Sequence, residues 1–347
     1  MKLFTHKDVQ WIFGFLLCFL VSALLSTLYS SNIGISLPIY ISYVAGACVL
    51  FCAFLLAQRE KYRRINEWLL FLFIAYSVVI AGVLLYQHFI LHIPRPRSIV
   101  GWPNIAARYL ELTIPVIISL LFYRGMAVQW RMISVIGLTI MLGGLFVTYT
   151  RGAWVAVGIA VLCLFVINKK YKLLSILALF IPILFLKDKL GLQRLNSIIE
   201  FKHPDNIERI NGWISSIHMI ADYPLTGIGF GNFRASYLEY MLPQAQEKLV
   251  HAHNILLIFG TESGIPTTVF FILFVISVII YIIKGVKKLT NEYHQYLVCG
   301  MSFAVISLLI NGMVDHPFHQ LALRIAFFFE LGFCLGIVRS YLENDNK

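Results

Sequence analysis

The sequence predicts an all-α protein, a polytopic transmembrane helix bundle of about ten spans with one large outer loop. The chain of 347 residues is 59% hydrophobic and only 13% charged, which is more apolar surface than a soluble domain of this length could bury. Apolar runs long enough to cross a bilayer recur from end to end, and clusters of Lys and Arg residues mark every second gap between them. Most of the chain is therefore expected to lie within the lipid bilayer.

The apolar runs predict the positions of the spans, each close to the usual length of about 20 residues. They lie near residues 9–31, 36–57, 68–91, 104–123, 132–149, 153–168, 172–187, 254–283, 296–312 and 321–340. The first run follows Lys2 and Lys7 as a signal peptide would, but it is too long and lacks a small-residue cleavage site. In chain order, residues 1–187 form helices one to seven, residues 188–252 form the large loop, and residues 253–347 form helices eight to ten with a short tail.

The basic residues between the spans predict which side of the membrane each connection faces. The connections on one side of the membrane carry Arg59, Lys61, Arg63, Arg64, Arg124, Arg131, Lys169, Lys170, Lys172, Lys284, Lys287 and Lys288. The positive-inside rule makes this side cytoplasmic, together with both termini, so the large loop faces outward. The formal charge of +11 is scattered over short loops that flank apolar spans. This pattern indicates contact with membrane lipids and not with nucleic acid.

The six cysteines all lie in apolar segments. A disulfide framework is therefore not expected, and no zinc-binding spacing occurs among them.

Arg151 is the only charge between Arg131 and Lys169. Two helices drawn from this stretch have about 18 residues each, roughly 27 Å, which barely crosses the hydrocarbon core. Arg151 is therefore expected at the outer boundary of a tight hairpin. Its guanidinium suits a phosphate or diphosphate, and the alternative is an arginine that reaches the lipid headgroups.

The large loop is predicted to contain an amphipathic helix that lies on the outer membrane surface. The apolar positions at helical spacing are Ile207, Ile210, Ile214, Ile217 and Ala221, and Tyr223-Pro224 ends the run. Arg209 lies on the flank of this helix, where spacing alone favours a solvated edge charge. The glycines that follow, Gly227, Gly229 and Gly231, are expected to form a structural turn, because no strand and helix accompany them as in a dinucleotide site.

His251 and His253 stand at the start of the next span, where the helix dipole favours the neutral imidazole that a general base requires. The alternatives are a polar pair that marks the interface, or a metal pair, although no third and fourth ligands follow at a recognisable spacing. Glu262 is nine residues from His253, which places it on the opposite side of a continuous helix. A histidine–carboxylate pair between these two is therefore not predicted.

The span that begins near residue 254 is longer than the hydrocarbon core, about 45 Å as one helix. It is expected either to rise above the membrane or to bend at Gly260, Gly264 and Pro266.

Two further outward connections carry polar residues that could line a site, although an interfacial turn is the favoured interpretation of each. One contains Arg95 and Arg97 ahead of Trp102-Pro103-Asn104, and the other contains Asp315 and His316.

Taken together, these motifs resemble the signature of the bacterial O-antigen ligase and O-antigen polymerase superfamily. The motifs are His253-Asn254 followed after nine residues by Gly264, Thr150-Arg151-Gly152 on a hairpin, Arg209 ahead of Trp213, and Pro224-Leu225 with its glycine-rich tail. The likeness covers roughly residues 101–331. Its specificity comes from the order of the motifs and the topology.

The resemblance implies a multi-pass enzyme of the bacterial inner membrane whose active site is periplasmic. It implies an undecaprenyl-diphosphate-linked glycan donor, inverting transfer without metal or other cofactor, and a lipid A–core or other glycan acceptor. By position, His253 would be the base and Arg151 and Arg209 would bind the donor diphosphate. Possible accessory residues are His251, Asn254, Arg95, Arg97, Asp315 and His316.

Two departures from the family pattern leave a ligase and a polymerase both open. The segment Gly264-Ile265-Pro266-Thr267 lacks the usual second glycine, and ten spans are two fewer than is typical. A transporter or lipid-glycan flippase is the rival from another class. The near absence of charge at the span centres and of symmetry between the halves counts against it.

Overall fold

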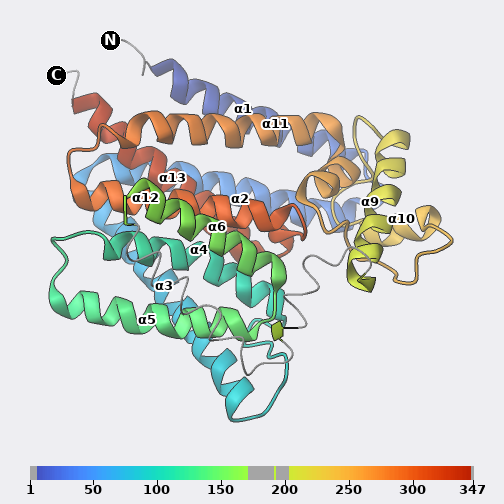
Figure 1. Ribbon diagram of the computed structural model, residues 1–347. Helices are drawn as coiled ribbons and strands as arrows, with labels where there is room; N and C mark the ends of the chain where they lie inside the picture. Colours follow the sequence, from blue (N-terminus) through green and yellow to red (C-terminus); the bar gives the residue numbers. More distant parts are fainter. Residues whose placement is uncertain (1–5, 171–190, 193–202, 345–347) are drawn as a thin grey trace. The chain divides into compact units, whose positions relative to one another are not determined.

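The computed structural model describes residues 6–170, 191–192 and 203–344, and within these ranges the fold is all helical (Figure 1). Eight of the described helices are long and apolar enough to cross a membrane, so the chain is a multi-pass membrane protein. These eight are α1 (His6–Leu28), α2 (Ile33–Gln58), α3 (Glu60–Phe89), α4 (Pro103–Leu121), α5 (Val128–Val147), α11 (Ile255–Val286), α12 (Glu292–Gly312) and α13 (Leu321–Asn344). The predicted fold class is confirmed.

Four further elements, all shorter than or outside these spans, complete the described part of the chain. Helix α6 (Arg151–Ile167) is apolar but shorter than the other spans, and the predicted span at residues 172–187 lies outside the described residues. The large loop contains α9 (Pro204–Asp222) and α10 (Phe233–Tyr240), and a short 3-10 helix, η1 (Pro317–His319), precedes α13. The linear division into residues 1–187, 188–252 and 253–347 stays a prediction.

The helices form two compact units, each built from segments that are distant in the sequence. The first unit contains α1, α2, α9, α10, α11, η1 and α13. The second unit contains α3, α4, α5 and α6 together with α12.

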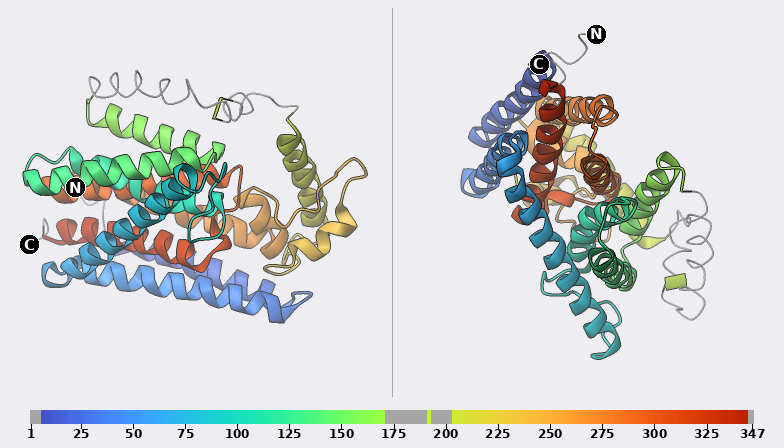
Figure 2. Two further views of the ribbon diagram at one scale, coloured as in Figure 1. Left: turned by 90° about the horizontal axis from the view of Figure 1, so that it is seen from below. Right: turned by 90° about the vertical axis from the view of Figure 1, so that its left-hand side faces the viewer.

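In the first unit, α11 packs along α1 and also contacts α13, while α9 runs across the end of α11 (Figures 1 and 2). Aromatic rings fill the space between these helices. Phe271 of α11 lies 6.0 Å from Phe318 of η1 and 6.3 Å from Phe327 of α13, and Phe318 lies 4.9 Å from Phe327, measured between ring centroids. Such pairs add to the burial of apolar area, and they fix η1 and the start of α13 beside α11.

Helix α11 is broken at Gly264, whose backbone has φ 80° and ψ 168°. The glycine-rich segment of the large loop occupies the break: Ile228 N donates to Thr261 O at 2.9 Å, and Ile265 N donates to Pro224 O at 2.8 Å. A Cβ on Gly264 would collide with the backbone of Leu225. The predicted bend of this span is confirmed, and the predicted structural turn supplies the hydrogen bonds that the broken helix lacks.

The same glycine-rich segment is attached to the connection between α1 and α2. Asn232 Nδ2 donates to Ser30 Oγ at 2.9 Å and to Ser36 Oγ at 3.1 Å. Ser31 N and its hydroxyl both donate to Ile228 O. Both ends of this contact lie in the first unit, so the large loop is held by the N-terminal helices as well as by α11.

The large loop also shares a hydrophobic core with the start of α11. Its buried members are Met219, Ile228, Phe233, Tyr237, Leu249, Ala252 and Ile258. Ala252 is fully buried in this core, so the chain next to His253 is fixed by apolar packing.

The amphipathic helix predicted in the large loop exists as α9, and its apolar stripe faces outward. Ile207, Ile210, Ile214 and Ile217 are all exposed. The buried face is polar instead, because the Glu208 carboxylate accepts hydrogen bonds from Gln246 N at 3.1 Å and Glu247 N at 3.2 Å. Helix α9 is thus held by these polar contacts and by Met219 in the hydrophobic core, and it presents isoleucines to its surroundings.

In the second unit, α4 packs against α3, α5 and α6 and is buried along most of its length. Two buried polar side chains join it to α12, since Asn311 Nδ2 donates to Glu111 Oε1 at 2.6 Å. Helix α5 ends at Val147 and α6 begins at Arg151, so the predicted tight hairpin is confirmed.

Candidate functional site

His253 lies immediately before α11 in a backbone conformation that is rare for residues other than glycine, with φ 48°. Asn254 makes this turn possible because its Oδ1 accepts hydrogen bonds from Leu256 N at 2.9 Å and Leu257 N at 3.1 Å, as an N-cap does. Its Nδ2 donates to Met313 O at 3.0 Å, which joins the start of α11 to the last outward connection.

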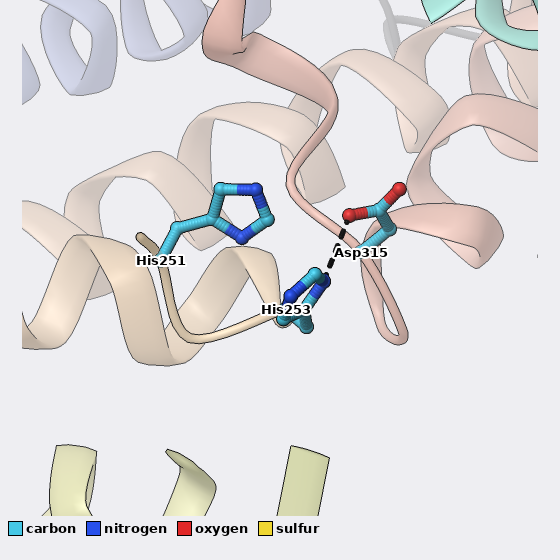
Figure 3. Close-up of side chains that lie close together, drawn as sticks. All are labelled: His251, His253 and Asp315. Carbon is cyan, nitrogen blue, oxygen red and sulfur yellow. Dashed lines mark hydrogen bonds and ion pairs between the residues drawn. The ribbon is translucent and has the colours of Figure 1, made fainter. Parts of the chain in front are cut away.

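Asp315 is the hydrogen-bond partner of His253 (Figure 3). The distance from His253 Nδ1 to Asp315 Oδ1 is 3.1 Å. The Asp315 side chain is 5% exposed and that of His253 is 23% exposed, so the carboxylate is sheltered while the imidazole reaches the surface. Asp315 Oδ1 also accepts from His316 N at 2.9 Å, which fixes the carboxylate. A proton on Nδ1 leaves Nε2 of His253 as a hydrogen-bond acceptor.

His251 completes a cluster with these two residues, as Figure 3 shows. Its ring centroid lies 4.2 Å from that of His253 and 5.7 Å from that of His316. His251, His253 and Asp315 each offer a possible metal-ligand atom, and these atoms lie within 4.8 Å of one another. The cluster can therefore act as a carboxylate-oriented base, and Asp315 is a third residue able to ligate a metal, which the spacing of the two histidines did not reveal.

Arg209 lies on α9 and is half-buried. It makes no hydrogen bond or ion pair with the residues that the structure describes. The structure thus puts Arg209 in the same unit as the histidine cluster, without joining the two.

Arg151 occupies the first position of α6 and is buried. Its surroundings in the second unit are polar, because Asn104 Oδ1 accepts from Arg95 Nη2 at 2.9 Å and from Thr150 Oγ1 at 3.3 Å. Arg95 Nε also donates to Thr148 O at 3.2 Å. The N-cap residue Thr150 gives α6 no side-chain cap. Two arginines and the uncapped start of a helix form an arrangement that suits an anion.

Arg97 is exposed, and its guanidinium lies 5.1 Å from the centre of the Trp102 ring, which is a cation–π contact. It belongs to the same outward connection as Arg95.

Sequence reasoning missed a cavity of about 140 Å³ beside His251. The cavity is lined partly by Tyr43, Glu262 and Arg324, which are all buried. Arg324 could have been found, because an arginine inside the apolar run of the last span is unusual. Glu262 was considered only as a partner of His253, which it is not in the structure.

A family model described as O-antigen ligase matches residues 136–272. The matched residues include Arg151, Arg209 and His253, whereas Arg95, Arg97, Asp315 and Arg324 lie outside them. The resemblance to the O-antigen ligase and polymerase superfamily is confirmed by this match. Among curated individual proteins, none matches the chain.

Proposed function

We propose that this chain, whose residues 136–272 match the O-antigen ligase family, is a glycosyltransferase of the bacterial inner membrane. It would move a glycan from undecaprenyl diphosphate to an acceptor hydroxyl on the periplasmic face. The observation that carries this proposal is the hydrogen bond between His253 and Asp315 at the start of α11. An imidazole oriented by a buried carboxylate is suited to accept a proton from a reacting hydroxyl.

In the proposed reaction, Nε2 of His253 accepts the proton of the acceptor hydroxyl while the hydroxyl oxygen attacks the anomeric carbon. The bond between the anomeric carbon and the diphosphate oxygen breaks, and undecaprenyl diphosphate leaves with the electron pair. Attack from the side opposite the leaving group inverts the anomeric configuration. Asp315 accepts the hydrogen bond from Nδ1 and stabilises the imidazolium that forms.

Arg151 and Arg209 are the proposed ligands of the donor diphosphate. A guanidinium offers a fork of donors that matches phosphate oxygens, and it stabilises the negative charge that grows as the diphosphate leaves. Arg95 and the start of α6 support the assignment of Arg151, because both add positive potential at the same turn. The assignment of Arg209 depends on its place in the resemblance alone.

The proposed transfer needs no metal, since the base accepts the proton and the arginines offset the charge of the leaving group. Activity is therefore expected to persist in EDTA. A loss of activity in EDTA that added zinc restores would reassign His251, His253 and Asp315 as metal ligands.

The acceptor that we propose is a sugar of lipid A–core, which makes the protein a ligase. Only short outward connections are predicted around the single large loop, and this favours a ligase over a polymerase. A product in which lipid-linked repeat units are joined to one another would identify a polymerase instead.

The experiment is a transfer assay with purified protein in nanodiscs, undecaprenyl-diphosphate-linked oligosaccharide as donor, and either lipid A–core or a second lipid-linked glycan as acceptor. His253→Ala is expected to lower kcat by about 10²–10⁴-fold, the usual contribution of a general base. Arg151→Ala is expected to weaken donor binding and turnover together.

His218→Ala and Arg234→Ala are the matched controls, because both side chains are exposed in the same large loop. Both should keep wild-type activity. Full turnover by His253→Ala would reject the role of the base, and movement of labelled lipid-linked glycan across the bilayer without a transfer product would indicate a transporter.

A further inference from the structure

The cavity beside His251 lies wholly within the first unit and extends from the surface towards α13. Gly231 and Val250 are exposed and form its mouth, whereas Glu262, Phe318 and Arg324 are buried and form its floor. Its volume is about 140 Å³. This space suits a single sugar ring and is smaller than a pocket for a drug-sized ligand, which is about 300–1,000 Å³.

Arg324 is the polar group that most directly indicates a ligand. It is 6% exposed, its guanidinium lies 4.9 Å from the centre of the Tyr43 ring, and its Nε meets no hydrogen-bond acceptor among the described residues. Buried donors in proteins almost always have a partner. A buried guanidinium that lines a cavity and keeps an unused N–H can donate that hydrogen bond to a molecule that enters.

The polar groups of the cavity include both hydrogen-bond acceptors and donors. The Glu262 carboxylate accepts backbone hydrogen bonds from Gly231 and Phe233 and interacts electrostatically with Arg324. A carboxylate has about four lone-pair sites, so it can still accept from ligand hydroxyls. Glu262 offers acceptor oxygens and Arg324 offers N–H donors, so a sugar would find both donors and acceptors for its hydroxyl groups.

The walls of the cavity are aromatic, with Tyr43, Phe230 and Phe318 among the lining residues. Flat apolar walls with a few well-placed polar groups are typical of small-molecule sites, and they match the apolar C–H face of a pyranose ring.

The mouth of the cavity lies next to the proposed base. His251 lines the cavity, and its ring centroid is 4.2 Å from that of His253. The proposed base, His253, must reach the acceptor hydroxyl that it deprotonates. We therefore assign a sugar bound in the cavity beside His251 to the acceptor.

We propose that this cavity binds one neutral sugar residue of the acceptor, with Glu262 and Arg324 as its hydrogen-bonding and specificity-determining residues. The inference rests on the proposed function, because it assigns the cavity to the acceptor of that transfer.

The test uses full-length protein in nanodiscs and two independent readouts. The first is the KM for each substrate in the transfer assay. Arg324→Lys keeps the charge but loses the planar fork, and it should raise the acceptor KM by about tenfold, the effect of roughly one hydrogen bond. The donor KM should stay within twofold of wild type. Arg234→Lys, at an exposed position on α10, is the matched control.

The second readout is binding of soluble methyl hexopyranosides without donor, measured by saturation-transfer NMR. Wild type should show contact with at least one pyranoside, and Arg324→Lys should weaken it. Val250→Trp obstructs the mouth from an exposed position and tests the cavity even if Arg324→Lys does not fold, with the exposed Leu238→Trp as its control.

The outcomes separate the two proposals. Absence of transfer together with pyranoside binding at this cavity would reject the proposed function and keep the sugar site. Normal transfer with unchanged acceptor KM in both Arg324→Lys and Val250→Trp would overturn the sugar site alone. Binding of inorganic pyrophosphate in place of pyranosides would also overturn it.

Discussion

The backbone of His253 is held in an unfavourable conformation by its neighbours. A residue other than glycine at φ 48° costs on the order of 1–3 kcal/mol and persists only where the surroundings hold it in place. Ala252 is anchored in the core of the large loop, Asn254 caps α11, and Asp315 holds the ring. Three separate contacts therefore fix one imidazole, which is what a positioned base requires.

Replacing Asp315 by Asn tests whether the carboxylate charge matters beyond its shape. The amide of Asp315→Asn can still accept from Nδ1 of His253 but offers no negative charge to an imidazolium. We expect kcat to fall by roughly 10²-fold, within the usual contribution of acid–base catalysis, while the donor KM changes little. Asp222→Asn, in the exposed part of the large loop, is the control. An unchanged kcat in Asp315→Asn would remove the carboxylate from the proposed mechanism.

Individual residues could be predicted where they interrupt a pattern. Arg151 is the only charge in a long apolar stretch, and His253 begins a span, so both were candidates from the sequence. Asp315 follows His253 by 62 residues, and the topology predicted only that the two share one side of the membrane. Their contact depends on the packing of η1 and α13 beside α11, which no local spacing encodes.

At the scale of elements, α11 and the glycine-rich segment are interdependent. The helix is interrupted at Gly264, and the backbone of the loop takes the hydrogen bonds that the interruption releases. Proline at position 266 and glycine at 264 made a bend predictable. The loop that fills it was not predictable, because its backbone groups lie 33 to 41 residues earlier in the chain, and its glycines indicate a turn but not the partner of that turn.

Substitution of Gly264 by Ala should therefore damage the first unit. A Cβ is strained at φ 80° and would collide with the backbone of Leu225, so we expect a loss of about 1–3 kcal/mol of stability. Gly158→Ala is the matched control, because a Cβ there meets nothing within 4 Å and lies inside a helix. Thermal unfolding in detergent measures the difference. Equal melting temperatures of the two variants would show that the break tolerates a side chain.

Helix α9 shows what the spacing of apolar residues can predict and what it cannot. The isoleucine spacing predicted the helix and its amphipathic character, and the structure confirms both. Periodicity does not state which face turns inward. Here Glu208 binds two backbone N–H groups and turns the polar face towards the loop, so the isoleucines remain exposed. In a membrane protein, lipid is a suitable neighbour for such a stripe.

At the scale of the whole molecule, the distribution of basic residues predicts one orientation in the membrane. The large loop and the histidine cluster should be extracytoplasmic, and the Lys-rich connections should be cytoplasmic. Two exposed positions test this orientation, Gln246 in the large loop and Lys287 at the end of α11.

In a variant without the native cysteines, Gln246→Cys should react with a membrane-impermeant maleimide in intact cells with a permeable outer envelope. Lys287→Cys should react only after lysis. Labelling with the opposite pattern would move the histidine cluster to the cytosol, where the proposed periplasmic transfer could not occur.

The serine hydroxyl groups in and next to the connection between α1 and α2 limit which fragments of the chain can keep their structure. Ser30, Ser31 and Ser36 receive or donate the hydrogen bonds that hold the segment around Asn232, although they precede the family-matched region by about a hundred residues. Residues 136–272, which match the family model, therefore depend on the amino-terminal helices for part of their structure. Fragments or chimeras that keep residues 136–272 but exchange the amino-terminal hairpin would lose the anchor of the turn that supports the break in α11.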